Sequence, residues 1–574
     1  MIESILPKLL PLPAPLWKPL ARVLGFPAVE QTYSELRGDR GIENRLLDKL
    51  GITIRASKSD LDRIPSTGPT LILANHPFGI LDGAVLAALL KRIRADVKFV
   101  GNDVLTTIPE LRDLVLPVDV TGTRINSRGM RAALGHLEAG GCLTIFPAGE
   151  VSHFRWSNRS ITDARWNVSA SRLVEILARR GIAVSTVPAY VAGANSLLFQ
   201  AAGCVHSSLR TALLVRELLN KRGQVVDVRI GTAIDSARLL ELATPSERTE
   251  YLRWRTYLLA SREKFKPKTS RPFVRPRAAT VAAIAMPVDP SALDAEVSTL
   301  TPLVASSGLT AYIARADEIP GVLQEIGRLR EATFRVAGEG TGHPVDLDRF
   351  DEHYLHLFVW QAEKREIVGA YRLCPAQSGD LYTRTLFRYG GPFLKKLGPA
   401  IELGRSFVRV EYQRTFAPLL VLWKGIGRFI AQHPQYRTLF GPVSISNEYQ
   451  SISRELMVTY LERHASLTGW MNLVKSRNPF RRRKLELPAN IDLEDLSTVV
   501  SDLEPQRTSI PILLRQYLRL GGKLLGFNVD PDFSNALDGL ILVDLAKTER
   551  KLLERYLGKA EAAQFLEHQK GQHE

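Results

Sequence analysis

The sequence predicts an α/β protein with two domains. The chain has 574 residues, too many for one ordinary hydrophobic core. Residues 45–262 alternate apolar runs with amphipathic stretches, as the strands and helices of a layered α/β fold do. A similar alternation fills residues 306–556, after a basic stretch at 263–305 rich in Pro and Ala that is typical of a linker.

The composition favours an intracellular protein that is attracted to anionic partners. Hydrophobic residues make up 45% and charged residues 24%, as in ordinary globular proteins, and the net charge is +16. No motif for nucleic-acid binding is evident, so we expect no nucleic acid. The three cysteines are scattered, which predicts neither disulfides nor a metal site. No apolar run reaches the roughly 18 residues of a membrane-spanning helix.

In the first domain, apolar runs predict strands near 71–74, 97–101, 142–146, 183–191 and 225–230. Helices are expected at 84–94, 127–138, 168–180 and 245–261. The last begins with Thr244, Pro245 and Glu247, a capping box with proline in the first helical position. Residues 1–44 precede this domain, and their Leu, Trp and Lys content predicts an amphipathic segment on a membrane surface.

A histidine lies at the turn between the strand at 71–74 and the helix that follows. His76 is followed six residues later by Asp82. Imidazole titrates near neutral pH and accepts a proton from a hydroxyl, while a carboxylate fixes its tautomer. The pair suits acyl transfer from a thioester to an alcohol. The alternative is a structural histidine at a helix start.

Further motifs follow later strands: Leu116 to Asp119 with Thr123-Arg124, then Leu143 to Glu150, then Val187-Pro188. Together with Asn75-His76 and Asp82 they resemble, in this order, the glycerolipid O-acyltransferases. The resemblance covers roughly the first 260 residues. It implies His76 as base, Asp82 as its partner, backbone donors near Gly149 for the oxyanion, and Asn75, Arg124 and Glu150 as further substrate-binding residues.

Two departures from that family bear on the acceptor. Five residues separate His76 from Asp82 where the family has four, and Gly79 is the plausible extra one. Ala148 occupies the place of a family glutamate, and the arginine that ends the family motif is missing. In the family those two residues help to hold a phosphate-bearing acceptor. We therefore expect an acceptor other than glycerol phosphate, and Glu150 would suit a positively charged ornithine side chain.

The second domain is expected to contain strands near 311–315, 356–361, 367–374, 401–408 and 438–446, and helices at 318–334 and 418–432. Residues 557–574 are expected to be a charged tail. Two basic runs, at 264–277 and 477–484, suit either solvated linkers or contact with anionic headgroups.

Several pieces of this domain resemble the acyl-homoserine-lactone-synthase branch of the GNAT acyltransferases, and most of all bacterial N-acyltransferases that make lyso-ornithine lipid. They are Arg330 with Phe334, the strand that holds Arg372, Glu402 to Arg405, Leu439 to Gly441, and the segments 511–518 and 529–533. The resemblance implies that Glu402 assists deprotonation of an amine. Arg330, Arg372 or Arg405 would bind a carboxylate or phosphate.

Because side chains alternate along a strand, Glu402 and Arg405 are expected on opposite faces of the sheet unless a bulge intervenes. The alternative to a functional role is that one of them forms an internal ion pair. The stretch 411–418 has no glycine, which disfavours a backbone cradle for coenzyme A. An acyl carrier protein is therefore the expected donor and partner, with acyl-coenzyme A as the alternative. No permanently bound cofactor is expected.

A chain with these two domains in this order resembles the fused bifunctional ornithine lipid synthases of bacteria. They imply N-acylation of ornithine with a 3-hydroxyacyl group, then O-acylation of that hydroxyl, by a peripheral enzyme on the cytoplasmic face of the inner membrane. A lysophospholipid O-acyltransferase with a non-catalytic C-terminal domain is the second hypothesis. A non-catalytic binder of membranes or nucleic acid is the third, supported only by charge.

Overall fold

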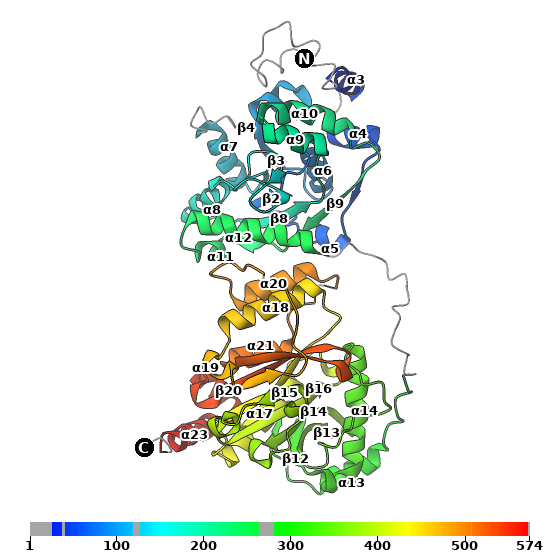
Figure 1. Ribbon diagram of the computed structural model, residues 1–574, viewed down its shortest axis with the longest axis vertical. Coiled ribbons are helices and arrows are strands. Elements are labelled where there is room, and N and C mark those ends of the chain that lie inside the picture. The colour runs from blue at the N-terminus through cyan, green and yellow to red at the C-terminus, as the bar shows by residue number, and fades with distance from the viewer. Residues whose placement is uncertain are drawn as a thin grey trace. The chain divides into compact units, whose positions relative to one another are not determined.

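A computed structural model describes residues 26–36, 41–118, 127–205, 207–262, 281–483, 485–506 and 508–571 (Figure 1). The chain divides into two compact units. Unit 1 contains residues 1–263 and 488–507, and unit 2 contains residues 264–487 and 508–574. Both units combine helices with a β-sheet, so the predicted α/β class is confirmed. The expected N-terminal membrane segment lies mostly outside the described residues.

Unit 1 is built on a mainly parallel sheet with the strand order β1-β9-β8-β2-β5-β3-β4, and β10 pairs with β8. The strands are β1 (Thr53–Arg55), β2 (Thr70–Ala74), β3 (Val97–Asn102), β4 (Val115–Val118), β5 (Cys142–Ile145), β8 (Ser185–Val191), β9 (Val225–Ile230) and β10 (Ile234–Asp235). The helices are α3 (Phe26–Leu36), α4 (Ile42–Lys49), α5 (Lys58–Leu61), α6 (Ile80–Leu90), α7 (Ser127–Glu138), α8 (Ser169–Arg179), α9 (Leu197–Val205), α10 (Ser207–Leu219), α11 (Ser236–Leu240) and α12 (Pro245–Leu258).

Helices cover both faces of this sheet, which explains why its central strand is an unbroken apolar run. Ile72 and Ala74 of β2 pack into the core that includes α6. Leu71 and Leu73 lie on the other face and pack with residues of α8 and α12. As expected for the start of α12, the Thr244 hydroxyl accepts a hydrogen bond from the Glu247 backbone N–H at 3.2 Å.

One helix of unit 1 comes from far along the chain. Helix α20 (Leu493–Leu503) falls in the sequence range predicted for the second domain, yet its acidic side chains bond to unit 1. Asp495 accepts from Tyr251 at 2.7 Å and also from Arg238. Asp502 accepts from Arg255 at 3.1 Å and from the Thr232 hydroxyl at 2.6 Å. No local sequence pattern predicts that α20 packs in unit 1, because the partner of each acidic residue lies about 250 residues away in the sequence.

We expect Asp502→Ala to destabilise the full-length protein by about 3–5 kcal/mol, because it leaves the Arg255 guanidinium buried without its carboxylate. The Asp502 and Arg255 side chains are only 4% and 3% exposed. Denaturant unfolding followed by circular dichroism measures the change. The control is Glu250→Ala, which breaks an ion pair whose partners are 81% and 67% exposed and should cost less than about 1 kcal/mol. Equal costs for both variants would contradict the prediction.

Unit 2 is built on one mixed sheet with the order β11-β12-β13-β14-β16-β17-β20-β19. The strands are β11 (Val304–Ser306), β12 (Leu309–Ala314), β13 (Leu355–Gln361), β14 (Glu366–Pro375), β16 (Ala400–Val408), β17 (Thr438–Ile445), β19 (Lys523–Asp530) and β20 (Ala536–Asp544). A short ribbon pairs β15 (Phe387–Tyr389) with β18 (Val474–Ser476). The helices are α13 (Pro290–Ser298), α14 (Pro320–Val336), α15 (Thr383–Leu386), α16 (Phe393–Leu397), α17 (Ala417–Gln432), α18 (Ser451–His464), α19 (Thr468–Met471), α21 (Ile512–Arg519), α22 (Arg550–Leu557) and α23 (Lys559–Gly571).

Strands β16 and β17 lie parallel and pair only at their beginnings. Their register joins 400–402 to 438–440, and no pair follows Glu402 with Phe440. Gly441 comes next on β17, and a Cβ atom there would lie 2.0 Å from the Leu403 carbonyl oxygen. The two backbones therefore still lie very close at Leu403 and Gly441, one residue beyond the last paired residues, and only glycine fits at position 441.

Within the described ranges, no helix has both the length and the apolarity to cross a bilayer, and no cluster of metal-ligating side chains occurs.

Candidate active sites

The site in unit 1 forms where β2 ends and α6 begins. His76 Nδ1 lies 2.8 Å from Asp82 Oδ2, and the Asp82 side chain is fully buried. The same carboxylate oxygen accepts the backbone N–H of Phe78 and of Gly79, both at 2.9 Å. With Nδ1 bound in this way, Nε2 is the nitrogen that remains for a substrate. The His76 side chain is 18% exposed.

Gly79 makes the longer His-to-Asp spacing workable. Its φ of +94° lies in a region that favours glycine, and it caps the N-terminus of α6. The chain therefore turns sharply after Phe78, and Asp82 in the first turn of α6 still reaches the imidazole. Burial raises the pKa of the Asp82 carboxyl, and hydrogen bonds from His76 and from the two backbone N–H groups partly counteract it.

A β-hairpin fixes the backbone of His76 from the other side. The hairpin consists of β6 (His153–Arg155) and β7 (Ser160–Thr162). At its base, the Ser152 N–H donates to the His76 carbonyl at 2.8 Å, and Asp163 accepts the His76 N–H at 3.2 Å. The Ser152 hydroxyl also donates to Asp163. Sequence reasoning missed both residues, since each contacts only the backbone of the histidine.

The remaining residues expected in this site have clear places. Both ends of the Asn75 amide bond to the backbone of Val191 at 2.7 and 2.9 Å, which holds β2 against β8. The Gly149 N–H donates to the Phe146 carbonyl at 3.1 Å and is therefore used within its own turn. The Phe146 ring stacks on His76 with centroids 4.1 Å apart. Arg124 lies outside the described residues.

Glu150 does not present a free negative charge. Its carboxylate accepts from Arg155 at 3.2 Å and from Arg210 at 2.5 Å, so the group of three carries one net positive charge. The loop that holds Glu150 runs from Phe146 to Ser152, both of which touch His76. This arrangement suits an anionic part of the acceptor better than the ornithine ammonium expected from sequence.

We expect Asp82→Asn to lower the O-acyl transfer that the sequence predicts for this site by about 10²–10⁴-fold, because the amide cannot stabilise the imidazolium or fix its tautomer. The pKa of Asp82 is raised in the folded state, so the ionised carboxylate destabilises the fold at a pH above that pKa. This destabilisation disappears as the pH falls through the raised pKa. The variant should therefore be no less stable than the wild type at neutral pH. Kinetics and thermal unfolding measure the two effects, and parallel losses of activity and stability would contradict the assignment.

The candidate site in unit 2 is centred on Glu402, which is fully buried on β16. Its carboxylate accepts the Tyr354 hydroxyl at 2.7 Å and the Thr383 hydroxyl at 2.6 Å. Burial raises the pKa of Glu402, against the effect of these hydrogen bonds. A carboxyl group with a raised pKa is suited to accept a proton from an ammonium group.

A bulge in β16 brings Arg405 to the same neighbourhood. Arg372 pairs with Gly404 while Ala370 pairs with Phe407, so β16 has one residue more than β14 over this stretch. Arg405 has a φ of +47°. Its guanidinium lies 5.0 Å from the ring of Tyr382, the residue before Thr383. Strand alternation alone would have placed Glu402 and Arg405 on opposite faces of the sheet, and this bulge is the exception that the sequence analysis allowed for.

The three arginines expected in this site differ in their partners. Arg330 is fully engaged, because its guanidinium binds both carboxylate oxygens of Asp351 at 3.0 and 2.8 Å and the Asp346 carbonyl oxygen. Arg372 donates to Asp348 at 2.7 Å through Nη1 only. Its Nε and Nη2, and the Nε of Arg405, are buried and make no hydrogen bond among the described residues, although Arg405 Nε lies 3.7 Å from the Asp346 carboxylate. Both guanidinium groups lie 5.0 Å from the Tyr382 ring.

Sequence reasoning missed three acidic residues near Arg405. Glu339 accepts from the Ser444 hydroxyl at 3.0 Å, and Ser444 pairs across the sheet with Asp538. Asp530 accepts from the Tyr382 hydroxyl at 3.2 Å. Burial raises the pKa of Glu339 to about 7, and it raises that of Asp538 well above its usual value. The motif at 529–533 includes Asp530, but no pattern in the sequence singles out Glu339.

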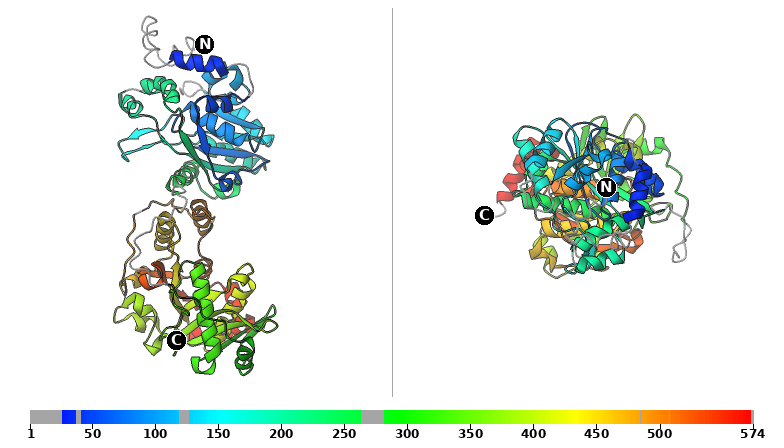
Figure 2. Two further views of the ribbon diagram at one scale, coloured as in Figure 1. Left: turned by 90° about the vertical axis from the view of Figure 1, so that its right-hand side faces the viewer. Right: turned by 90° about the horizontal axis from the view of Figure 1, so that it is seen from above.

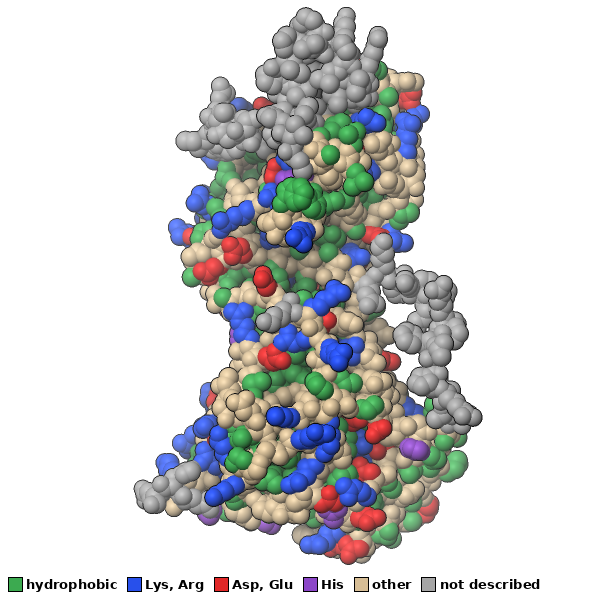
Figure 3. Space-filling view, viewed as in Figure 1, with side chains coloured by type: hydrophobic (Ala, Val, Ile, Leu, Met, Phe, Trp, Pro, Cys, Tyr) green, Lys and Arg blue, Asp and Glu red, His purple; other side chains and the backbone are tan. Residues whose placement is uncertain are grey.

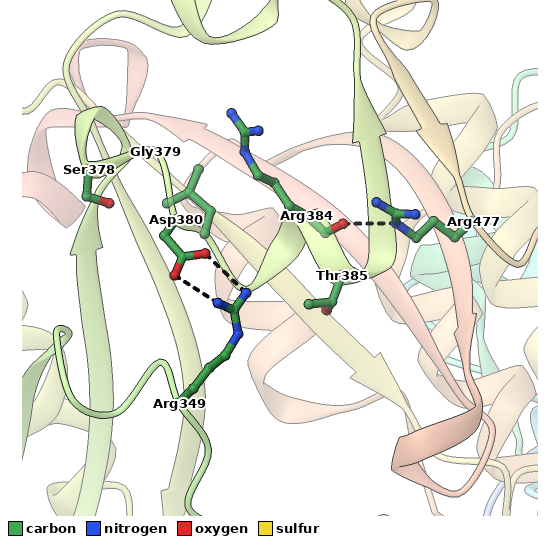
Figure 4. A pocket seen from close by; sticks show the side chains of 8 residues that line it. Arg349, Ser378, Gly379, Asp380, Arg384, Thr385 and Arg477 are labelled. Atoms are coloured by element: carbon green, nitrogen blue, oxygen red, sulfur yellow. Dashed lines mark hydrogen bonds and ion pairs between the residues drawn. The ribbon is translucent and has the colours of Figure 1, made fainter.

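A polar hollow lies beside α15, whose residue Thr383 donates to Glu402. Its volume is about 570 Å³, and its lining includes Arg349, Asp380, Arg384 and Arg477. Arg349 pairs with Asp380 at 3.2 Å, and Arg477 Nε donates to the Arg384 carbonyl oxygen at 2.9 Å. Figure 4 shows the Arg384 guanidinium pointing away from the Arg349–Asp380 pair. Among the described residues, Asp380 is the one acidic residue in the lining and it pairs with Arg349, so Arg384 and Arg477 leave the hollow with an excess of positive charge.

The two sites define an acyltransferase. Residues 29–264 match the family model described as "Acyltransferase", and residues 329–424 match the model of the GNAT acetyltransferase domain. The chain belongs to the family of the glycine N(alpha)-acyltransferase of Bacteroides thetaiotaomicron. It is 32% identical to that protein over 257 residues, which are 40% of this chain and 76% of the relative.

Two other comparisons concern O-acyl transfer. The lyso-glycine lipid O-acyltransferase of Phocaeicola vulgatus is 25% identical over 208 residues, which are 35% of this chain and 71% of the relative. The crystal structure of the lysophosphatidic acid acyltransferase PlsC from Thermotoga maritima covers 41% of this chain and 90% of its own, at 15% identity and a TM-score of 0.23. At that TM-score the likeness supports no conclusion about the site.

Proposed function

We propose that this protein is a bifunctional aminolipid synthase. Unit 2 joins a 3-hydroxyacyl group to the α-amine of an amino acid, and unit 1 then acylates the 3-hydroxyl. The observation that carries the proposal is the presence of two separate proton-accepting sites, His76 with Asp82 and the buried Glu402. Relatives named for each of the two steps support it.

In the first step, Arg372 and Arg405 bind the carboxylate of the amino acid through the N–H groups that make no hydrogen bond within the protein. Glu402 accepts a proton from the α-ammonium, and the free amine attacks the thioester carbonyl carbon. The C–N bond forms, the C–S bond breaks, and the thiolate takes the second proton of the amine. Arg330, engaged by Asp351, supports the loop around Asp348, to which Arg372 donates.

In the second step, His76 Nε2 accepts the proton of the 3-hydroxyl while Asp82 stabilises the imidazolium. The alkoxide attacks a second acyl thioester, an ester bond forms, and the imidazolium returns its proton to the leaving thiolate. The acceptor retains the carboxylate of its amino acid. Arg155 and Arg210, with one net positive charge after Glu150 is counted, are placed to bind it.

Ornithine is the proposed amino acid, because the site in unit 2 contains buried acids that a second ammonium would neutralise. Glu339, Asp530 and Asp538 lie near Arg405, and burial raises the pKa of Glu339 to about 7. An ornithine side chain would supply the missing cation. Glycine is the second candidate, favoured by the names of both relatives.

The proposed donor is an acyl carrier protein. Helix α17 follows the stretch 411–416, which has no glycine to cradle a coenzyme A pyrophosphate with backbone N–H groups. Basic side chains instead surround the hollow beside α15, whose lining includes Arg384 and Arg477. On the neighbouring β15–β18 ribbon, Arg388 lies opposite Lys475. Like charges opposite each other disfavour the ribbon and suit an acidic partner. We place the enzyme at the cytoplasmic face of the bacterial inner membrane.

Expression in a bacterial host that lacks aminolipids tests the proposal. Extracted lipids are analysed by mass spectrometry after growth with isotopically labelled ornithine or labelled glycine. A new diacylated lipid that contains the ornithine label is expected. A glycine label in that lipid would select the second candidate. Acylated phospholipids without an amide would favour the lysophospholipid O-acyltransferase instead.

A further inference from the structure

Exposed hydrophobic side chains gather around the hairpin that holds His76. In unit 1, seven large hydrophobic side chains among the described residues are exposed, and four of them lie on the hairpin or at the start of α9. We call these four the apolar rim: Trp156 is 77% exposed, Ile161 37%, Leu197 86% and Leu198 51%. On soluble proteins, a group of neighbouring exposed hydrophobic side chains usually marks a site that binds a ligand, a protein or a membrane.

The rim is one continuous feature of the fold. Phe154 of β6 pairs with Ile161 of β7, and its ring contacts Trp156 with centroids 5.1 Å apart. The Phe154 N–H donates to the Gln200 side chain of α9 at 2.8 Å, which ties the hairpin to the turn that begins with Leu197. The hairpin projects from its unit in the left view of Figure 2, and Figure 3 shows hydrophobic side chains gathered on the surface of unit 1.

We propose that the apolar rim inserts into a bilayer with anionic headgroups and so presents His76 to its lipid substrate. This inference rests on the proposed function of unit 1. Arg159 lies in the hairpin turn beside Trp156, and both are exposed. Tryptophan and arginine are residues that occupy the headgroup layer, where Trp prefers the interface and each basic residue attracts anionic lipid.

The base of the hairpin explains why this contact would serve catalysis. Ser152 and Asp163 at the two ends of the hairpin bond to the backbone of His76. Trp156 follows Ser152 by four residues, which corresponds to roughly 13 Å along a strand, and one headgroup layer is roughly 5–8 Å thick. A hairpin that enters the bilayer at a tilt therefore brings His76 close to the headgroups, where the hydroxyl of a monoacylated amino acid lies.

Vesicle flotation of the full-length chain tests the proposal, with vesicles of phosphatidylglycerol and phosphatidylcholine. The double variant Leu197→Glu with Leu198→Glu should weaken binding at least tenfold. The matched control is Val225→Glu, which changes a 55% exposed side chain of the same unit at the start of β9 and should leave binding within twofold. Brominated lipids should quench the wild type more than Trp156→Phe, which reports insertion of the hairpin itself.

O-acylation of a short-chain 3-hydroxyacyl amide that is soluble in water separates this proposal from the proposed function. The double variant should retain this activity within threefold while it loses vesicle binding. Unchanged vesicle binding, or equal quenching of wild type and Trp156→Phe, would overturn the membrane assignment. Loss of the soluble reaction in a folded double variant would also overturn it, since the rim would then belong to the substrate pocket. A wild type without the soluble reaction would instead refute the proposed function.

Discussion

Cells that express His76→Ala should accumulate the monoacylated amino acid and contain no diacylated lipid. Without the imidazole, no group in this site accepts the proton of the 3-hydroxyl, and the loss of a general base lowers a rate by about 10²–10⁴-fold. The first acylation is the one proposed for unit 2, and it should continue. Lipid mass spectrometry of the aminolipid-free host measures both species in one extract.

The matched control for this prediction is His153→Ala. His153 belongs to the same hairpin system, and its Nδ1 lies 3.2 Å from the Val151 carbonyl oxygen, with no contact to Asp82. This variant should retain most of the diacylated product. Persistence of the diacylated lipid in His76→Ala would remove the histidine from the mechanism.

Glu402→Gln should eliminate both lipids, because the second acylation has no acceptor when the first one fails. Glutamine keeps the size of the side chain, but it cannot accept a proton from the substrate, and its NH₂ group would face a hydroxyl that now donates to the carboxylate. We expect N-acyl transfer to fall by about 10²–10⁴-fold. Burial raises the pKa of Glu402, so wild-type N-acyl transfer should decline as the pH falls through that raised value.

Addition of synthetic monoacylated amino acid distinguishes a chemical defect from a folding defect in Glu402→Gln. The diacylated lipid should reappear, since His76 and Asp82 are unchanged. Glu411→Gln is the matched control, because the Glu411 side chain is 65% exposed and pairs with Arg409 at the surface. If Glu402→Gln forms the monoacylated product at the wild-type rate, Glu402 is not the base.

The fold was predictable where the signal is local. Continuous apolar runs such as residues 71–74 indicated buried strands, and Thr244 with Pro245 marked the start of α12. The His76–Asp82 pair was predictable for the same reason, because both residues belong to one turn.

Features that depend on distant parts of the chain were not predictable. The contacts of Ser152 and Asp163 with the His76 backbone, and that of Arg210 with Glu150, join segments far apart in sequence. Polar residues at such positions resemble ordinary surface residues until the fold brings them together. The bulge at Arg405 has the same character, because strand alternation alone places it away from Glu402.

Cleavage at a protease site introduced between residues 263 and 280 should yield two fragments that remain together through gel filtration. The larger fragment carries α20, whose Asp495 and Asp502 bond to Tyr251 and Arg255 of the smaller one. Separate expression of the two halves, cut between residues 263 and 280, would deprive the smaller half of α20 and leave the buried Arg255 without the Asp502 carboxylate. A gene split that keeps both activities would therefore need to move the codons for 488–507 to the upstream part.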